Sequence, residues 1–322
     1  MFVTVCACTY RRPQGLRALL DGLARQRFRA TRAPQLALVI ADNEGSAEAE
    51  RACAAFRSAS PLALRYVREP RRGIPWARNA CLDHVPPESD FFAMIDDDEV
   101  PEPDWLDELL RAQAASGADV VQGAVVPRFP EAAPAWMREG SFFGWPNQRL
   151  VEKSEAPVDG QALGSAATNN VLVRCAAVRK LDLRFDTRVG LRGWDDALFF
   201  RALARGGARI VYAARARVVE IVPPERATLR YLLRVEYRQG QKKLPIKLLF
   251  HEPPAGAGER ARLRAKTALR GVAALASGVW WIARSVLAGA RRPRRFAIGV
   301  LRLANGTGML ASVFGARYEH YR

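Results

Sequence analysis

The chain contains few of the residues on which disulfide frameworks and soft-metal sites depend. Its 322 residues include five cysteines and three histidines, and no two cysteines form a Cys-x-x-Cys pair. An odd, scattered set of cysteines argues against a disulfide-stapled secreted domain and is typical of a reduced cytosolic compartment. We expect the histidines, His84, His251 and His320, to lie on the surface rather than in a catalytic site.

Three further features are missing, and each absence counts against a class of protein. No Gly-x-x-x-x-Gly-Lys-Ser/Thr loop occurs, which disfavours a P-loop phosphotransferase. The first residues lack the basic segment and apolar core of a signal peptide, so we expect a cytoplasmic protein. No apolar stretch reaches about 18 residues without a charge, so clean membrane spans are not predicted.

Positive charge is abundant but concentrated near one end of the chain. The formal net charge is +17, yet residues 1–225 hold 30 Lys and Arg against 29 Asp and Glu. Residues 226–322 hold 20 against four. Such a basic region is attracted to a polyanion, either nucleic acid or an anionic membrane surface. Because the chain has no RNP-type motif for reading nucleic acid, we do not expect a nucleic-acid partner.

Short apolar runs alternate with helical patterns over the first 125 residues. This rhythm predicts a mainly parallel, doubly wound α/β sheet, whose ligands bind at the carboxyl ends of the strands. The expected strands are residues 2–8, 36–41, 62–67, 91–95, 120–126 and 170–174. The expected helices are residues 13–26, 47–57, 76–83, 104–116, one beginning near residue 195, and a basic one over 226–240.

The most informative segment is an acidic run, Asp96-Asp97-Asp98-Glu99, directly after the expected buried strand at 91–95. Adjacent carboxylates repel one another, which is costly unless they share a cation or a hydrogen-bonding ligand. The run therefore predicts a divalent metal site with hard oxygen ligands, of the type that holds a diphosphate. A solvated acidic turn is the plainer alternative.

Five short motifs, in this order, resemble those of the family 2 glycosyltransferases of GT-A fold. They are Val5-x-x-x-Thr9-Tyr10, Ala41-Asp42-Asn43, Gly73-x-x-x-Ala77-Arg78-Asn79, the Asp96 cluster and Gly193-Trp194-Asp195-Asp196. Thr168-Asn169-Asn170 strengthens the match. The chain looks most similar to bacterial exopolysaccharide enzymes of the succinoglycan-biosynthesis type. The resemblance implies a GT-A catalytic domain over residues 1–240, which leaves a basic, membrane-associated region over residues 241–322.

The resemblance implies inverting transfer of a sugar from a nucleotide donor, which we expect to be a UDP-sugar, with Mg²⁺ or Mn²⁺. Asp98 would ligate the metal. Many relatives carry a histidine ligand where this chain has Glu220, so either Glu220 replaces it or the metal has one strong protein ligand. The residues expected to bind the donor are Thr9, Tyr10, Asp42, Asn43, Arg78, Asp96 and Asp97.

Individual roles at the donor site also follow from the resemblance. Asp42 would accept the N–H of a uracil, framed by Thr9, and Arg78 would meet the base or a phosphate. Asp96 would face the ribose or a metal-bound water. The plainer alternatives are a turn aspartate for Asp42 and a solvated helix face for Arg78.

The resemblance places the catalytic base on Asp196, the second carboxylate of a pair that opens a helix. An inverting enzyme needs such a base to remove the proton of the attacking hydroxyl. Asp195 would bind hydroxyls of the acceptor or tune its neighbour. Two carboxylates at a helix N-terminus also have a purely structural explanation, because they complement the helix dipole.

Two apolar stretches, residues 271–283 and 296–316, dominate the basic region. They are flanked by arginines, and the first contains the pair Trp280-Trp281. This composition predicts helices that lie in the headgroup region, which makes the protein peripheral on the inner face of the cell membrane. Helices packed on the catalytic domain, or a short re-entrant hairpin, are the alternatives.

The expected acceptor is a glycan or lipid-linked glycan, and residues 127–160 are predicted to form a functional loop over the site. Two other readings remain open from the sequence. A nucleic-acid-binding protein would explain the basic region but not the acidic run. A nucleotidyltransferase or phosphotransferase on a similar sheet would explain the acidic run but not the full series of motifs.

Overall fold

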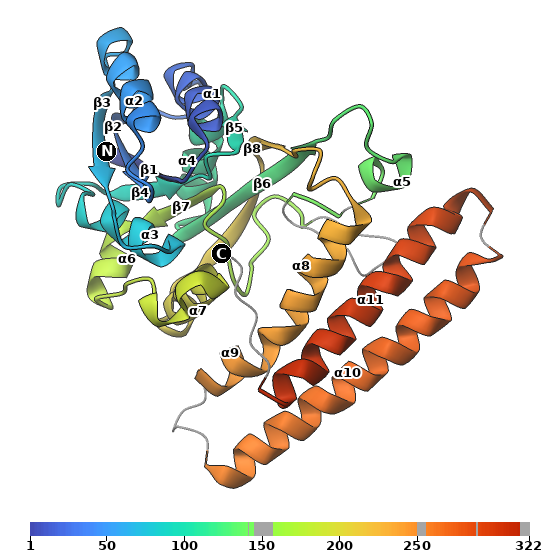
Figure 1. Cartoon of the computed structure of the whole chain (residues 1–322). Coiled ribbons are helices and arrows are strands. Elements are labelled where there is room, and N and C mark those ends of the chain that lie inside the picture. Colours follow the sequence, from blue (N-terminus) through green and yellow to red (C-terminus); the bar gives the residue numbers. More distant parts are fainter. Residues whose placement is uncertain (141, 145–156, 250–255, 288, 316–322) are drawn as a thin grey trace.

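The computed structural model describes residues 1–140, 142–144, 157–249, 256–287 and 289–315, which form a sheet with helices on both faces and a group of long helices beside it (Figure 1). The strands are β1 (Phe2–Thr9), β2 (Gln35–Asp42), β3 (Ala63–Arg68), β4 (Phe91–Met94), β5 (Glu99–Pro101), β6 (Val120–Arg128), β7 (Val171–Arg174) and β8 (Ile210–Ile221). The helices are α1 (Pro13–Ala24), α2 (Ala47–Ala59), α3 (Ile74–Asp83), α4 (Trp105–Ser116), α5 (Ala135–Arg138), α6 (Cys175–Lys180), α7 (Asp195–Arg205), α8 (Leu229–Gln241), α9 (Lys243–Leu249), α10 (Ala257–Ser285) and α11 (Arg292–Val313). Two 3₁₀ turns are η1 (Thr187–Arg192) and η2 (Gly289–Arg291).

The eight strands form one sheet in the order β3-β2-β1-β4-β7-β6-β8-β5. All strands run in one direction except β7 and β5, which are antiparallel to their neighbours. The predicted mainly parallel α/β sheet is therefore confirmed, and the two reversed strands lie in its second half. Because β1, β2 and β4 are parallel and in register, their carboxyl ends meet at one edge, where Thr9 lies opposite Asp42.

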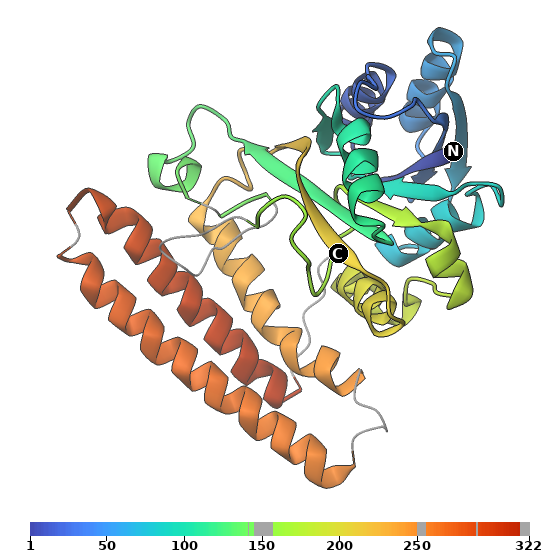
Figure 2. The same cartoon turned by 180° about the vertical axis from the view of Figure 1, so that it is seen from behind.

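Two apolar cores cover the two faces of the sheet. Leucines of α1, with α2 and Trp105 of α4, pack on one face. Helices α3, α6 and α7 pack on the other face, where Phe185 and Phe199 stack with ring centroids 4.2 Å apart. Figure 2 shows the arrangement from behind. The rigid double-sided packing holds the carboxyl edge of the sheet in place.

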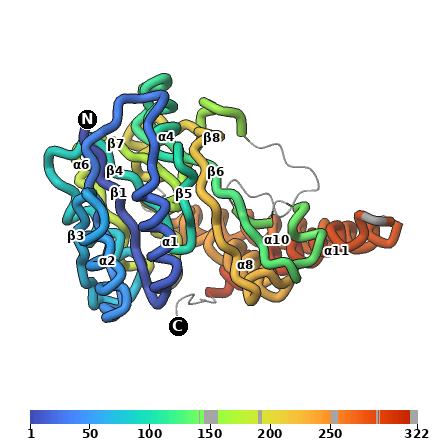
Figure 3. The backbone as a smooth tube through the Cα atoms, turned by 90° about the horizontal axis from the view of Figure 1, so that it is seen from above, coloured from blue at the N-terminus to red at the C-terminus, as the bar shows by residue number. Residues whose placement is uncertain are grey.

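Beside the sheet, α8, α10 and α11 pack along one another, with α11 between the other two (Figure 1), and the view from above shows these helices to one side of the sheet (Figure 3). The approach of α10 to α11 depends on glycines. A Cβ at Gly278 would lie 2.8 Å from the carbonyl oxygen of Gly299, and one at Gly306 would lie 2.7 Å from that of Gly271. Small residues at both contact points therefore let the two backbones come close.

Among the described residues, α11 alone has the length and apolar composition that crossing a membrane would need, and half of its most apolar window is buried by the rest of the protein. The outward side of α10, in contrast, exposes Leu269, Val272, Val279 and Trp280. The domain boundary predicted at residue 240 falls at the end of α8, which packs against α11; that boundary stays a prediction.

Candidate active site

Predicted site residues from all five motifs converge at the carboxyl edge of the sheet. Thr9 ends β1, Asp42 ends β2, and the acidic run begins just after β4. Arg78 lies in α3, which follows β3, and Asp195 opens α7. Segments more than 100 residues apart in the chain therefore meet at one place, as expected for a ligand site of a doubly wound sheet.

Asp97 is the structural centre of the turn after β1. Its carboxylate accepts hydrogen bonds from Thr9 Oγ1 at 2.9 Å, the backbone N–H of Tyr10 at 3.4 Å and Arg12 Nη1 at 2.8 Å. Burial raises the pKa of Asp97, while the guanidinium of Arg12 acts in the opposite direction. Thr9, Tyr10 and Asp97 thus bond to one another, and their roles toward a donor stay predictions.

One carboxylate oxygen of Asp98 accepts hydrogen bonds from two arginines. Arg12 Nη1 donates to Asp98 Oδ2 at 2.8 Å, and Arg226 Nη1 donates to the same oxygen at 2.9 Å. Arg226 lies in the segment between β8 and α8, 128 residues from its partner. Neither arginine emerged as a site residue from the sequence. Arg226 has no motif around it, and Arg12, two residues after the Thr9-Tyr10 motif, is one of two adjacent arginines that the sequence does not distinguish.

Asp96 lies beside Asp97 and Asp98 in a crowded acidic environment. The pKa of Asp96 is raised to about 7, chiefly by burial; Arg78 acts to lower it, and Asp98 and Asp97 add to the rise. The backbone N–H of Asp96 donates to Glu99 Oε2 at 3.0 Å. Glu99 is itself buried, and burial together with Asp96 raises its pKa well above the usual range. The cluster therefore holds more carboxylates than its arginines readily neutralise.

Glu220 lies directly across from Glu99 in the ladder between β5 and β8. It accepts a hydrogen bond from the backbone N–H of Gly144 at 3.2 Å and contributes to the raised pKa of Glu99. The structure thus brings Glu220 to the edge of the acidic cluster. Its role as a metal ligand stays a prediction.

The donor set of this cluster fits a hard divalent cation. Within the described ranges, no three His, Cys, Asp or Glu side chains are grouped as a ready coordination sphere. Mg²⁺ commonly uses only one or two carboxylates and takes its other ligands from water and substrate phosphates. Asp98, with Asp96 beside it, offers such a partial set, and the mutual repulsion of the carboxylates favours an added positive charge.

Arg78 forms a buried ion pair with Asp195. Burial alone would lower the pKa of Arg78, but Asp195, Asp96 and Asp196 raise it, so these carboxylates surround the guanidinium. Asp195 is only 1% exposed. Its carboxylate is therefore positioned to orient Arg78, whereas its predicted contact with acceptor hydroxyls remains untested.

Asp196 is half-buried at the start of α7, with Oδ1 accepting the backbone N–H of Ala197 at 2.7 Å. The residue before the pair, Trp194, has φ 144°, and Gly193 has φ 62°. A non-glycine residue with such a φ is strained, and strain of this kind concentrates at functional sites. The Gly-Trp junction thus places the two carboxylates at the helix N-terminus.

Asp42 and Asn43 hold loops at the edge of the site. The carboxylate of Asp42 accepts the backbone N–H groups of Glu44 at 2.9 Å and Ser46 at 2.8 Å, and Tyr66 Oη at 2.7 Å. Asn43 donates to carbonyls of the β3–α3 loop and accepts the N–H of Gly73 at 3.0 Å. Asp42 is 1% exposed, and both of its carboxylate oxygens are taken up by these contacts; base recognition by it stays a prediction.

The remaining motif, Thr168-Asn169-Asn170, has a structural role in which Asn170 is central. Asn170, with φ 62°, accepts Trp105 Nε1 at 2.6 Å and donates to the carbonyls of Ala124 and Ala216, both at 2.8 Å. It therefore joins α4 to β6 and β8 beneath the site. Of the predicted loop over 127–160, residues 141 and 145–156 lie outside the described part of the chain.

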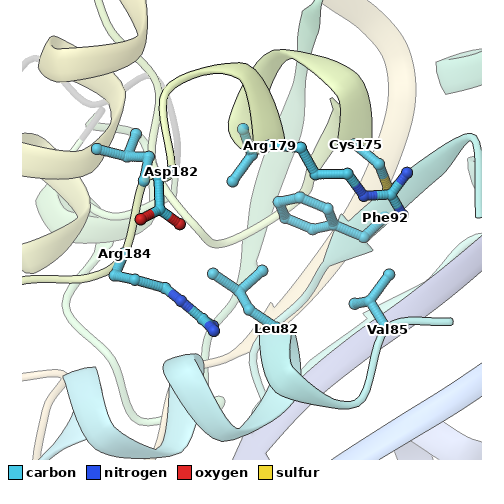
Figure 4. A pocket seen from close by; sticks show the side chains of 9 residues that line it. Leu82, Val85, Phe92, Cys175, Arg179, Asp182 and Arg184 are labelled. Carbon is cyan, nitrogen blue, oxygen red and sulfur yellow. The ribbon is translucent and has the colours of Figure 1, made fainter. Parts of the chain in front are cut away.

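A cavity of about 160 Å³ lies between α3, β4 and α6, apart from the acidic cluster (Figure 4). Leu82, Val85 and Phe92 form its apolar wall, and Arg179, Asp182 and Arg184 lie around it. Phe92 is near the beginning of β4, whereas Asp96 follows the strand's end. The cavity is therefore not part of the candidate active site.

Comparison with known proteins agrees with this geometry. Residues 4–182 match the family model of glycosyl transferase family 2. The succinoglycan biosynthesis protein ExoM of Rhizobium meliloti is 34% identical over 242 residues, which cover 75% of this chain and 74% of that protein. The glucosyl-dolichyl phosphate glucuronosyltransferase of Haloferax volcanii is 24% identical over 275 residues, or 82% of each chain.

A solved structure shows the same fold. The mannosyltransferase PcManGT from Pyrobaculum calidifontis, in complex with GDP-Man and Mn²⁺, superposes with a TM-score of 0.65 at 20% identity. The match covers 98% of this chain and 88% of that chain. The predicted GT-A fold is therefore confirmed. The chain, which places its acidic run and arginines at the carboxyl edge of this fold, belongs to glycosyl transferase family 2.

Proposed function

We propose that this glycosyltransferase is a metal-dependent, inverting enzyme of polysaccharide biosynthesis. It transfers a sugar from a nucleotide-sugar donor, expected to be a UDP-sugar, to a hydroxyl of a glycan or lipid-linked glycan. The observation that carries the proposal is the convergence of Asp96, Asp98, Arg78 and Asp196 at one edge of the sheet. The likeness to ExoM, whose name refers to succinoglycan biosynthesis, supports the polysaccharide context.

The donor diphosphate is assigned to Asp98 and the arginines around it. A Mg²⁺ or Mn²⁺ ion held by Asp98 would supply positive charge that stabilises the departing nucleoside diphosphate. Arg12 and Arg226 already lie on Asp98, so their guanidinium groups are available next to the diphosphate position. Buried carboxylates and arginines in one site give strong, preorganised electrostatics.

Asp196 is assigned as the base. It accepts the proton of the acceptor hydroxyl while that oxygen forms a bond to the anomeric carbon. The bond between this carbon and the phosphate oxygen breaks, and the nucleoside diphosphate leaves from the opposite face. Asp195 holds Arg78 beside the base through their buried ion pair. One carboxylate at the reacting carbon is sufficient for inversion.

Membrane association is the second part of the proposal. The outward side of α10 combines exposed Leu269, Val279 and Trp280 with basic neighbours, which suits a helix lying among anionic headgroups. The burial of α11 between α8 and α10 favours a peripheral enzyme over a spanning one. We place it in the cytoplasm, on the inner face of the cell membrane.

A donor screen tests the proposed activity. Slow hydrolysis of UDP-, GDP- and dTDP-sugars is measured with Mn²⁺, with Mg²⁺ and with EDTA. We expect turnover of one nucleotide class, dependent on the ion, and NMR of the transfer product should show the inverted anomer. Retention of configuration would show that Asp196 does not act as the sole base. Equal rates of hydrolysis in EDTA would show that the enzyme does not need a metal ion.

A further inference from the structure

Basic side chains from three helices gather beside the helix that carries the proposed base. Arg201 belongs to α7, Lys243 and Lys247 to α9, and Lys266 and Arg270 to α10. The positive charges of Arg270, Lys266 and Arg201 act on Lys247. Those of Lys247 and Arg270 act on Lys243. Helix α9 contacts α10, and in Figure 1 it lies between α7 and the first half of α10. We call these five residues the basic cluster.

Three of the five members of the basic cluster lack a carboxylate partner in the described part of the chain. Among the residues that the structure describes, Lys247, Lys266 and Arg270 form no ion pair with a carboxylate. Lys243 donates to Asn305 Oδ1 at 3.1 Å and has Glu236 nearby. Burial lowers the pKa of Lys247, and the positive charges of its neighbours lower it further. Holding these like charges together is unfavourable unless an anion binds among them.

Exposed apolar side chains lie next to the cluster on α10. Leu269 lies one helical turn after Lys266, and Val272 lies one turn after Leu269, with exposed fractions of 72% and 56%. An anion bound among the lysines and arginines would therefore have room for an alkyl chain along this row of α10.

We propose that the basic cluster binds the phosphate or diphosphate group of a lipid. A phosphate oxygen would accept hydrogen bonds from Lys247, Lys266 and Arg270, and the lipid chain would lie on the apolar side of α10. Two sources share this chemistry: the phosphate of a lipid-linked acceptor and an anionic lipid headgroup. The first source rests on the proposed function, whereas the second does not depend on catalysis.

Vesicle sedimentation of the full chain in EDTA tests the site without the metal. Phosphatidylcholine vesicles contain either a polyprenyl phosphate or phosphatidylglycerol at equal surface charge. The variant K247Q/K266Q/R270Q is compared with R17Q/R25Q/R57Q, which removes three exposed arginines from the catalytic-domain surface. We expect the cluster variant to bind at least about tenfold more weakly and the control variant to change less than about twofold.

The pattern of losses identifies the source. A loss restricted to polyprenyl phosphate supports an acceptor site, and equal losses on both vesicles support a headgroup site. A loss no larger than that of the control variant on either vesicle overturns the proposal. UDP binding with Mn²⁺ is measured on the same proteins and should not change. If the unmodified chain fails to bind UDP, the proposed function fails, while the vesicle comparison still decides the phosphate site.

Discussion

At the scale of single residues, two kinds of cation compete for the carboxylate of Asp98: the arginine side chains and the proposed metal ion. Arg12 and Arg226 both bond to one carboxylate oxygen of Asp98, the residue predicted to ligate a metal, with Nη1–Oδ2 distances of 2.8 and 2.9 Å. A carboxylate oxygen that already accepts two guanidinium groups is a weaker ligand for a third cation. If the proposed metal binds this oxygen, at least one of these arginines has to move.

Substitution of Arg226 by Gln should strengthen the binding of Mn²⁺ to the nucleotide-free protein several-fold, because it removes one competitor from Asp98. Calorimetry or the EPR signal of free Mn²⁺ measures this affinity. Arg217→Gln is the matched control, since Arg217 lies in β8 and approaches Glu102 only to 3.8 Å. Unchanged or weaker Mn²⁺ binding by the Arg226 variant would show that the metal does not share Asp98 with this arginine.

Asp196→Asn keeps the shape of the side chain and removes its ability to accept a proton. We expect the rate of sugar transfer to fall by at least about 100-fold, with UDP affinity nearly unchanged. Asp104→Asn, at the start of α4, is the control for a carboxylate at a helix beginning. Transfer within a few-fold of the unmodified enzyme would move the base elsewhere, with Asp195 as the next candidate.

The residues predicted from motifs and those found in the structure differ for a physical reason. Asp96, Asp98 and Arg78 lie in recognisable local patterns, and the structure brings them together. Arg12 and Arg226 depend on tertiary contacts across 86 and 128 residues, and no local spacing marks them. The burial of Asp42 and Asp97 was also not predictable, because it depends on loops that fold over them.

At the scale of elements, β5 and β8 were missed while every predicted strand is present. Strand β8 contains Arg215 and Arg217, which interrupt its apolar pattern, although Val211 and Val218 are fully buried. Strand β5 has only three residues and contains part of the acidic run. Both strands form through pairing with distant partners rather than through their own composition.

The packing of α8 on α11 depends on Gly308, where a Cβ would clash with the carbonyl oxygen of Tyr237. Gly308→Ala should lower the free energy of unfolding by about 1–3 kcal/mol, typical of overpacking. Gly258→Ala is the control, because a Cβ there meets nothing within 4 Å and alanine favours a helix. Thermal unfolding compares the two. Equal stability of the variants would contradict the tight contact between these helices.

At the scale of the whole molecule, charge and apolar surface occur together on the helices beside the catalytic sheet. We predict that the full chain sediments with vesicles containing anionic lipid, and that salt weakens this binding without abolishing it. Salt screens the lysines and arginines, whereas exposed residues such as Trp280 stay in the apolar layer.

A chain that ends at Pro254 is the comparison for this prediction, because it lacks α10 and α11. It should stay soluble, bind UDP with metal and lose most vesicle binding. Equal vesicle binding by both chains would contradict a membrane role for α10. Stronger retention of the full chain on nucleic acid than on anionic lipid would favour the nucleic-acid reading.

The most direct test of the whole account is calorimetric titration of UDP into the unmodified protein and into Asp98→Ala, each with Mn²⁺ and with EDTA. The account predicts that the unmodified protein binds UDP more tightly with Mn²⁺ and that Asp98→Ala loses this gain together with turnover. Glu102→Ala, which removes a half-buried carboxylate of the same loop region, should behave like the unmodified protein. Unchanged affinity of Asp98→Ala for UDP with Mn²⁺ would contradict the metal-dependent donor site.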